Sequence, residues 1–181
     1  MIFSSATIHA VTPRYEDGFY WTKTSLKCYV TPDTNTTYGT GVYNAICFGI
    51  LTWNSTDAPI AILSEDEDSA DWDVYVDMQP YGNTGWNARE ITFWNETTLI
   101  ANNATVYINY TGLENYTSDT GLWKAMASHE MGHVYGADHN TTTGEDSILK
   151  PVTTQYYNYI TGTPNITVPQ TPDIACINGI Y

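Results

Sequence analysis

The sequence is short of basic residues. Its 181 residues include 20 Asp and Glu but only six Lys and Arg, so the net charge of -14 comes from missing bases. The few bases are scattered along the chain and form no cluster that could neutralise successive phosphates. We therefore expect no nucleic acid and no membrane surface among the partners of this protein.

Long apolar runs and closely spaced cysteines are also missing. No run approaches the roughly 18 residues that cross a bilayer, which argues against a transmembrane protein. Cys28, Cys47 and Cys176 are too few and too widely spaced for a zinc knuckle or a small disulfide scaffold, and one disulfide with one free thiol stays open. The first eleven residues do not have the pattern of a signal peptide, so an exported form would be a mature or trimmed chain.

The chain does contain enough apolar surface for one domain. Hydrophobic residues make up 42% of it and aromatic residues 14%, which excludes a disordered chain. A length of 181 residues is too short for two ordinary domains. We expect a single domain over residues 1–181 and a monomer, with residues 1–20 as an extended N-terminal arm.

Asparagine and threonine fill much of the polar surface. Eight of the fourteen asparagines begin an Asn-x-Ser/Thr triplet: Asn35, Asn54, Asn95, Asn103, Asn109, Asn115, Asn140 and Asn165. This excess indicates N-glycosylation and an extracellular, secreted or cell-surface location. The alternative is a simple bias toward Asn and Thr.

Short apolar runs predict a mostly β first half. The predicted strands cover residues 26–30, 59–63, 72–78, 91–94 and 105–109. An acidic stretch joins two of them: Glu65, Asp66, Glu67, Asp68 and Asp71. Its carboxylates could hold Ca²⁺, but it lacks the fixed spacing of an EF-hand, which favours a solvated loop.

Three segments have helical periodicity. Apolar residues recur at four-residue spacing over about 38–53, although glycines there lower the helix propensity. A second helix is predicted over 120–135, with Asp119 or Thr120 as N-cap and Gly136 at its end. In the tail, Thr171 is the predicted N-cap and Pro172 the first helical residue.

Residues 129–139 read HEMGHVYGADH and contain three of the four histidines. His129 and His133 stand four residues apart, so their imidazoles share one helix face and can bind one metal ion. Gly136 permits a left-handed turn that returns His139 as a third ligand. Three neutral nitrogen ligands leave a fourth tetrahedral position open, which is typical of catalytic zinc. Glu130 then stands beside the ligand pair.

HExxHxxGxxH is the signature of the metzincin metalloproteases, and this sequence resembles them. Metzincins carry a tight methionine turn beneath the metal, and residues 147–151, SILKP, resemble that turn in the matrixin branch. Leu149 takes the place of the methionine, and its similar volume should preserve the apolar floor. Pro151 stands where astacin-like relatives have a metal-binding tyrosine, which favours the matrixin-like branch.

The outer segments extend the resemblance over nearly the whole chain. Trp21-Thr22-Lys23 before the first strand, the helix after it and the terminal helix from Thr171 to Tyr181 are similar to those of a matrixin catalytic domain. The resemblance implies an α+β metzincin fold: a twisted, mostly parallel five-stranded sheet with two long helices in an upper subdomain (21–136). A small irregular lower subdomain (137–181) would hold His139, the turn and a C-terminal helix.

Two features of matrixins are missing. No cysteine lies in a Pro-Arg-Cys-Gly-like segment before the domain. Matrixins also bind a second, structural zinc through His and Asp, and His9 is the only histidine left for it here. We therefore expect one zinc ion.

The pattern predicts a zinc endopeptidase acting on extended peptides. Zinc would acidify its water and polarise the scissile carbonyl, while Glu130 takes the proton and delivers it to the leaving amine. The peptide would lie as an added strand along the sheet edge, and Lys150, Tyr156 and Tyr157 are candidate residues of the substrate pocket. The alternative is a catalytically silent binding or structural module, for which Leu149 is the one hint. We also expect activity to fall as the pH drops through the imidazole range.

Overall fold

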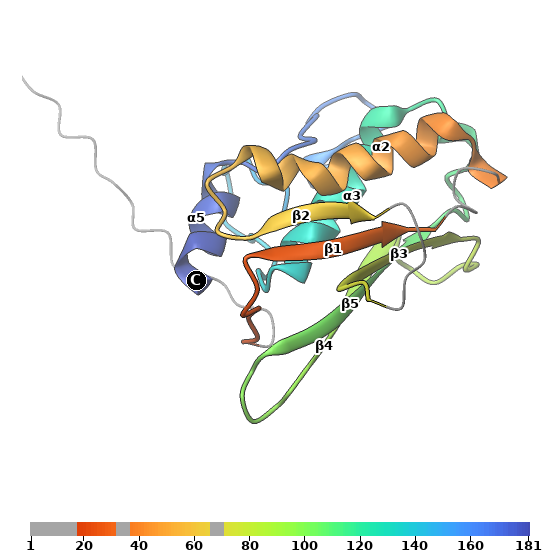
Figure 1. Cartoon of the computed structure of the whole chain (residues 1–181). Coiled ribbons are helices and arrows are strands. Elements are labelled where there is room, and N and C mark those ends of the chain that lie inside the picture. Colours follow the sequence, from red (N-terminus) through yellow and green to blue (C-terminus); the bar gives the residue numbers. More distant parts are fainter. Residues whose placement is uncertain (1–17, 32–36, 66–70) are drawn as a thin grey trace, which may run out of the picture.

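The computed structural model of the protein describes residues 18–31, 37–65 and 71–181. Its elements are, in chain order, β1 (Ser25–Val30), α2 (Thr40–Leu51), η1 (Thr52–Ser55), β2 (Ala61–Glu65), β3 (Val74–Gln79), β4 (Ala88–Trp94), β5 (Ala101–Asn109), η2 (Glu114–Tyr116), α3 (Thr120–Val134), α4 (Thr153–Tyr156) and α5 (Thr171–Ile180) (Figure 1). Most of the predicted arm, with His9, lies outside the described residues, as do Asn35 and residues 66–68 of the acidic stretch.

The strands form one five-stranded sheet in the order β2-β1-β3-β5-β4. All neighbouring pairs are parallel except β4 and β5, which form an antiparallel hairpin. The prediction of an α+β protein with a mostly parallel five-stranded sheet is confirmed. The hairpin is longer than the predicted runs 91–94 and 105–109, because the backbone ladder continues through polar positions such as Asn103 and Arg89.

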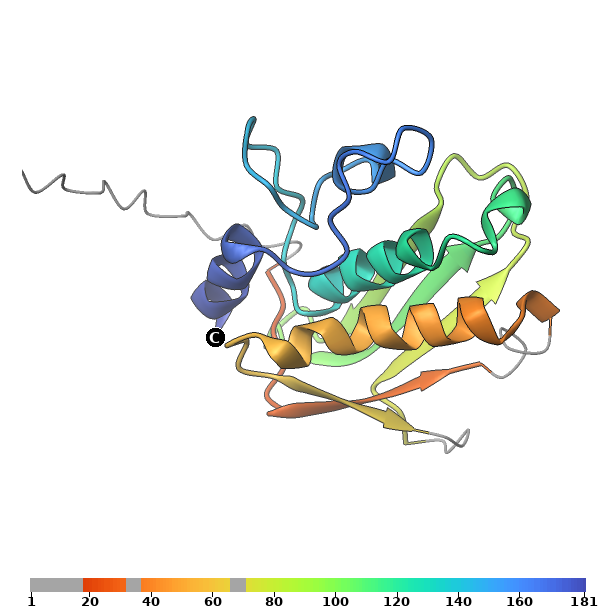
Figure 2. The ribbon, with the colours of Figure 1, turned by 90° about the horizontal axis from the view of Figure 1, so that it is seen from above.

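Helices α2 and α3 cover one face of this sheet. Figure 2 shows them side by side, with the irregular segment 137–170 on the side of α3 away from α2. Gly49 permits the close approach, because a Cβ atom there would lie 2.3 Å from the backbone oxygen of Lys124 in α3. A glycine that lowers the helix propensity of α2 thus allows α2 to pack on α3. In the described part of the chain, no helix has both the length and the apolar composition needed to cross a membrane.

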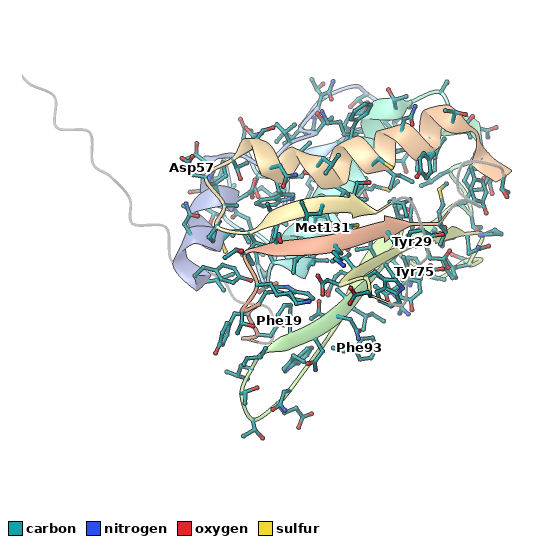
Figure 3. All side chains as sticks on the ribbon, in the orientation of Figure 1. Phe19, Tyr29, Asp57, Tyr75, Phe93 and Met131 are labelled. Atoms are coloured by element: carbon teal, nitrogen blue, oxygen red, sulfur yellow. The ribbon has the colours of Figure 1, made fainter. Side chains whose placement is uncertain are left out.

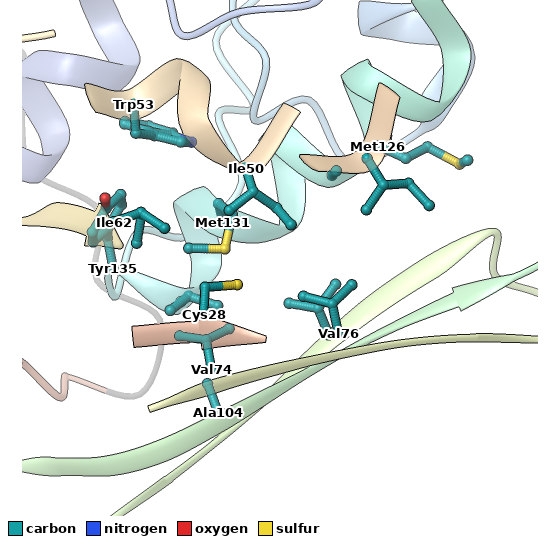
Figure 4. Close-up of a cluster of buried hydrophobic side chains, with 14 of the residues drawn as sticks. Cys28, Ile50, Trp53, Ile62, Val74, Val76, Ala104, Met126, Met131 and Tyr135 are labelled. Carbon is teal, nitrogen blue, oxygen red and sulfur yellow. The ribbon is translucent and has the colours of Figure 1, made fainter. Parts of the chain in front are cut away.

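The core lies between the sheet and these two helices. Figure 4 shows Ile50 and Met131 from the helices above Val74 and Ala104 of the sheet. Trp53 is fully buried, and its indole nitrogen donates a 2.9 Å hydrogen bond to the carbonyl of Ser128 in α3. All three cysteines are free thiols, so no disulfide contributes to this core.

The chain after α3 is mostly irregular and ends in α5. The predicted cap of this last helix was wrong by one residue, because Gln170 is the N-cap and Thr171 the first helical residue. The Gln170 and Asp173 side chains form a reciprocal capping box, which satisfies more of the free N–H groups than a threonine alone would. Pro172 therefore takes the second helical position.

Candidate metal centre

Helix α3 positions the first two histidines. Of the two predicted N-caps it begins at Asp119, whose side chain accepts a 3.1 Å hydrogen bond from the backbone N–H of Leu122. The helix continues to Val134, so His129 and His133 lie one turn apart with both side chains buried. Their ring centroids are 4.7 Å apart.

The end of α3 returns the third histidine to the same place. Gly136 has a φ of 93°, the left-handed conformation that the sequence predicts, and a Cβ there would lie 2.8 Å from the carbonyl oxygen of Phe19. The chain then turns so that the ring of His139 lies 4.6 Å from that of His133 and 5.3 Å from that of His129. One ligand nitrogen from each histidine lies within 4.8 Å of the others, so this three-histidine cluster could hold a metal ion.

Two backbone carbonyls fix the tautomers of the buried histidines. The Nδ1 of His129 lies 2.7 Å from the oxygen of Ile148, and that of His133 lies 2.7 Å from the oxygen of Ala137. Because a carbonyl can only accept, each Nδ1 carries the proton and each Nε2 presents a lone pair. These two Nε2 atoms are 3.0 Å apart. Two lone pairs at that distance repel each other unless a cation lies between them.

The neutral form of His129 is further favoured by its surroundings. Burial lowers the pKa of this imidazole well below its usual value, and the nearby His133 lowers it further. The hydrogen bond to the carbonyl of Ile148 acts in the opposite direction but is outweighed. A neutral imidazole is the form that binds a metal ion.

Glu130 lies in the same cleft as the three histidines. Its carboxylate is buried, and one of its oxygens lies 4.0 Å from the Nε2 of His129. The sequence reasoning placed Glu130 beside the ligand pair, and the structure brings it there. A carboxylate in this position can exchange a proton with a molecule bound next to the cluster.

The turn that contains Leu149 lies beneath α3. Leu149 is buried, and its side chain occupies the space beside Gly132, where a Cβ atom would lie 2.4 Å from the leucine Cδ2. Leucine thus forms an apolar contact under the helix turn that carries the first two histidines. The turn is also tied to α5, because the buried carboxylate of Asp173 accepts hydrogen bonds from the Ser147 hydroxyl and the Ile148 N–H, at 2.5 and 2.9 Å.

A cleft of about 380 Å³ opens in front of the cluster. Besides the histidines and Glu130, the lining consists of residues 85–90 and of Pro151, Val152, Thr153 and Tyr156. The buried ring of Tyr156 stacks on His129, with centroids 4.8 Å apart and an interplanar angle of 17°.

The other two candidate pocket residues point elsewhere. Lys150 and Tyr157 are not among the residues that line this cleft. The Lys150 ammonium donates a 2.6 Å hydrogen bond to the carbonyl of Thr142, and the Tyr157 hydroxyl donates one of 2.6 Å to Asp119 at the start of α3. Both side chains therefore hold neighbouring segments in place.

Sequence reasoning missed Glu90 in the cleft lining and the structural role of Asn109. Asn109 is buried at the end of β5, and its Nδ2 donates to the carbonyl of Gly82, the hydroxyl of Thr84 and the carbonyl of Trp86. It thus anchors the segment that leads into the cleft. The only signal for Asn109 was its Asn-x-Thr triplet, which suggested a sugar instead.

The chain matches no family model and no curated protein sequence. The three-histidine cluster together with a mixed sheet is compatible with a zincin-like site.

Proposed function

We propose that the protein is a zinc-dependent endopeptidase of the metzincin type, similar to the matrixin branch. The observation that carries this proposal is the three-histidine cluster, which lines a cleft of about 380 Å³ together with Glu130. Structural zinc sites are closed by four protein ligands, whereas three protein ligands and an open side are typical of catalytic sites.

The nitrogen geometry supports zinc as the metal. Zinc binds histidine nitrogens at about 2.0–2.1 Å, so two of them in a tetrahedron are roughly 3.3 Å apart. The Nε2 atoms of His129 and His133 are already 3.0 Å apart, and only a small movement would bring them to that spacing. An all-imidazole donor set also suits zinc better than it suits calcium or magnesium, which prefer oxygen ligands.

When bound, zinc would supply Lewis acidity and a water of lowered pKa beside the substrate carbonyl. The chain's own residues do the rest. Glu130 takes up a proton and later delivers it to the leaving amine. Strand β4 is an edge strand of the described sheet, so its backbone can hold an extended peptide as an added strand. Tyr156 keeps the imidazole of His129 in its orientation by stacking on it.

The alternative, a silent binding or structural module, was suggested by Leu149 alone. Leu149 fills the space beneath α3 at Gly132, as an apolar residue under the metal should. Glu130 is a further argument for turnover, because it is not needed to bind a metal and yet lies buried beside His129.

The test is digestion of an unstructured protein by the zinc-loaded chain, with the fragments identified by mass spectrometry. We expect internal cleavage that is lost in Glu130→Ala and Glu130→Gln, while both variants keep one zinc per chain. The exposed Glu114→Gln should cleave like the unmodified chain. The absence of cleavage by a zinc-loaded chain, or equal cleavage by the Glu130 variants, would contradict the proposal.

A further inference from the structure

The cleft contains a second carboxylate, on β4. In the register of the hairpin, Glu90 pairs with Val106 and Arg89 pairs with Tyr107. Val106 is buried in the core beneath the helices, so Glu90 lies on the same face of the sheet as α3. Glu90 also lines the cleft that contains the three-histidine cluster.

A neighbour on the same strand orients this carboxylate. The hydroxyl of Thr92, two residues along and therefore on the same face, donates a hydrogen bond to Oε1 of Glu90. Thr92 is buried, so this contact holds the Glu90 side chain against β4 rather than in open solvent. A fixed carboxylate distinguishes ligands better than a freely rotating one.

The one arginine in the cleft lining lies on the opposite face of the sheet. The guanidinium of Arg89 lies over the rings of Trp86 and Tyr107, 5.1 and 5.3 Å from their centroids. Side chains alternate between the two faces along β4, so Arg89 and Phe93 share one face. Figure 3 shows Phe93 on the side of the sheet away from α2. The Arg89 guanidinium is thus held by stacking on these two rings. No lysine or other arginine lines the cleft within the described ranges.

We propose that Glu90 determines specificity, so that the cleft favours peptides with a Lys or Arg side chain next to the cleaved bond. This inference rests on the proposed endopeptidase function and adds the substrate class to it. A cationic side chain entering the cleft meets the carboxylate of Glu90, while an acidic side chain meets like charge and is rejected. The net charge of -14 acts in the same direction over a longer range.

The test compares three peptides that are identical except for Lys, Gln or Glu at the varied position. With the zinc-loaded chain, we expect kcat/KM to be about tenfold higher for the Lys peptide than for the Gln peptide, and lowest for the Glu peptide. Glu90→Gln keeps the shape and can still accept from Thr92, so it should fold normally. In this variant the Lys to Gln ratio should fall to about one.

Two further variants test whether the preference for the Lys peptide comes from the carboxylate of Glu90. Glu96→Gln removes the same charge from the exposed turn of the β4–β5 hairpin, outside the cleft, and should leave the ratio unchanged. Glu90→Lys should reverse the order of the Lys and Glu peptides. If the unmodified chain shows no preference for the Lys peptide, or if Glu90→Gln keeps that preference, the inference is wrong.

A binding measurement separates this inference from the proposed function. Fluorescence anisotropy with the zinc-loaded Glu130→Ala chain reports the affinity for each labelled peptide without turnover. We expect the Lys peptide to bind about tenfold more tightly than the Gln peptide, and Glu90→Gln in this background to remove the difference. If no chain cleaves any peptide but this difference is found, the peptidase proposal fails and the role of Glu90 stands. Equal affinities would overturn the role of Glu90.

Discussion

Asp173 connects the last helix to the three-histidine cluster. Its buried carboxylate accepts hydrogen bonds from Ser147, Ile148 and the N–H of Gln170, and the carbonyl of Ile148 in turn holds Nδ1 of His129. Burial raises the pKa of Asp173 above its usual value, and the hydrogen bonds, which act in the opposite direction, only partly offset this effect. A residue 44 positions after His129 therefore helps to orient that imidazole through the backbone of Ile148.

Replacing Asp173 should weaken both the fold and the metal site. In Asp173→Asn, an amide NH₂ replaces one of the two carboxylate oxygens. It cannot accept the hydrogen bonds that this oxygen received, so we expect a loss of about 1–3 kcal/mol in unfolding free energy. Zinc affinity should fall about tenfold. Urea unfolding and competition with a zinc-binding dye measure the two effects. Asp57→Asn, an exposed matched variant, should change neither. Unchanged zinc affinity in Asp173→Asn would refute the link.

The pH dependence of stability follows from His129. Its pKa is lowered in the folded chain, whereas an unfolded histidine has a pKa of about 6.5. Between these two values the unfolded chain binds more protons, so stability rises with pH and is lost as the pH falls below about 6.5. We expect the Tm of the metal-free protein to fall between about pH 7.5 and 5. His129→Gln should show a flatter curve, and identical curves for the two proteins would argue against this contribution.

At the scale of elements, close approach between helices depends on small residues. Gly49 places α2 against the backbone of α3, and Gly132 makes room for Leu149 beneath α3. Helix α3 is therefore held from both sides along the stretch that carries His129 and His133. Helix α3 also packs against β4, whose residues Ala88, Arg89 and Glu90 line the cleft.

Replacement of two glycines of α2 by alanine should change the unfolding free energy in opposite directions. Gly49→Ala forces a Cβ against the oxygen of Lys124, and we expect a loss of about 1–3 kcal/mol in unfolding free energy. Gly41→Ala, in the first turn of α2, meets nothing within 4 Å and should be neutral or stabilising by up to about 1 kcal/mol. Thermal and urea unfolding of both variants provide the comparison. Equal effects would mean that Gly49 does not set the helix spacing.

On the scale of the whole molecule, local patterns were predictable and long-range partners were not. Helix α3 follows from its periodicity, its Asp119 cap and Gly136, and the spacing of the three histidines placed them correctly around one point. Glu90 and Asp173 carry no such signal, because their roles come from strand register and from a contact between segments distant in sequence. Asn109 even suggested a different role, since an Asn-x-Thr triplet looks the same whether its amide is exposed or buried.

The overall charge leads to a prediction about salt. A chain with a net charge of -14 attracts cationic peptides over distances that salt screens. Raising the ionic strength from about 20 mM to about 300 mM should lower kcat/KM several-fold for a Lys-containing peptide. The rate for a matched neutral peptide should change little. A parallel fall for both peptides would point to an effect of salt on the fold or the metal instead.

Metal binding tests the central claim most directly, because every proposed step depends on the three-histidine cluster. Equilibrium dialysis with elemental analysis, followed by X-ray absorption at the zinc edge, should find one zinc per chain with three nitrogen neighbours at about 2.0 Å. His129→Ala and His133→Ala should each abolish stoichiometric binding, whereas His9→Ala, outside the motif, should retain it. A chain that binds no zinc, or that binds it equally well without His129 and His133, would contradict the account.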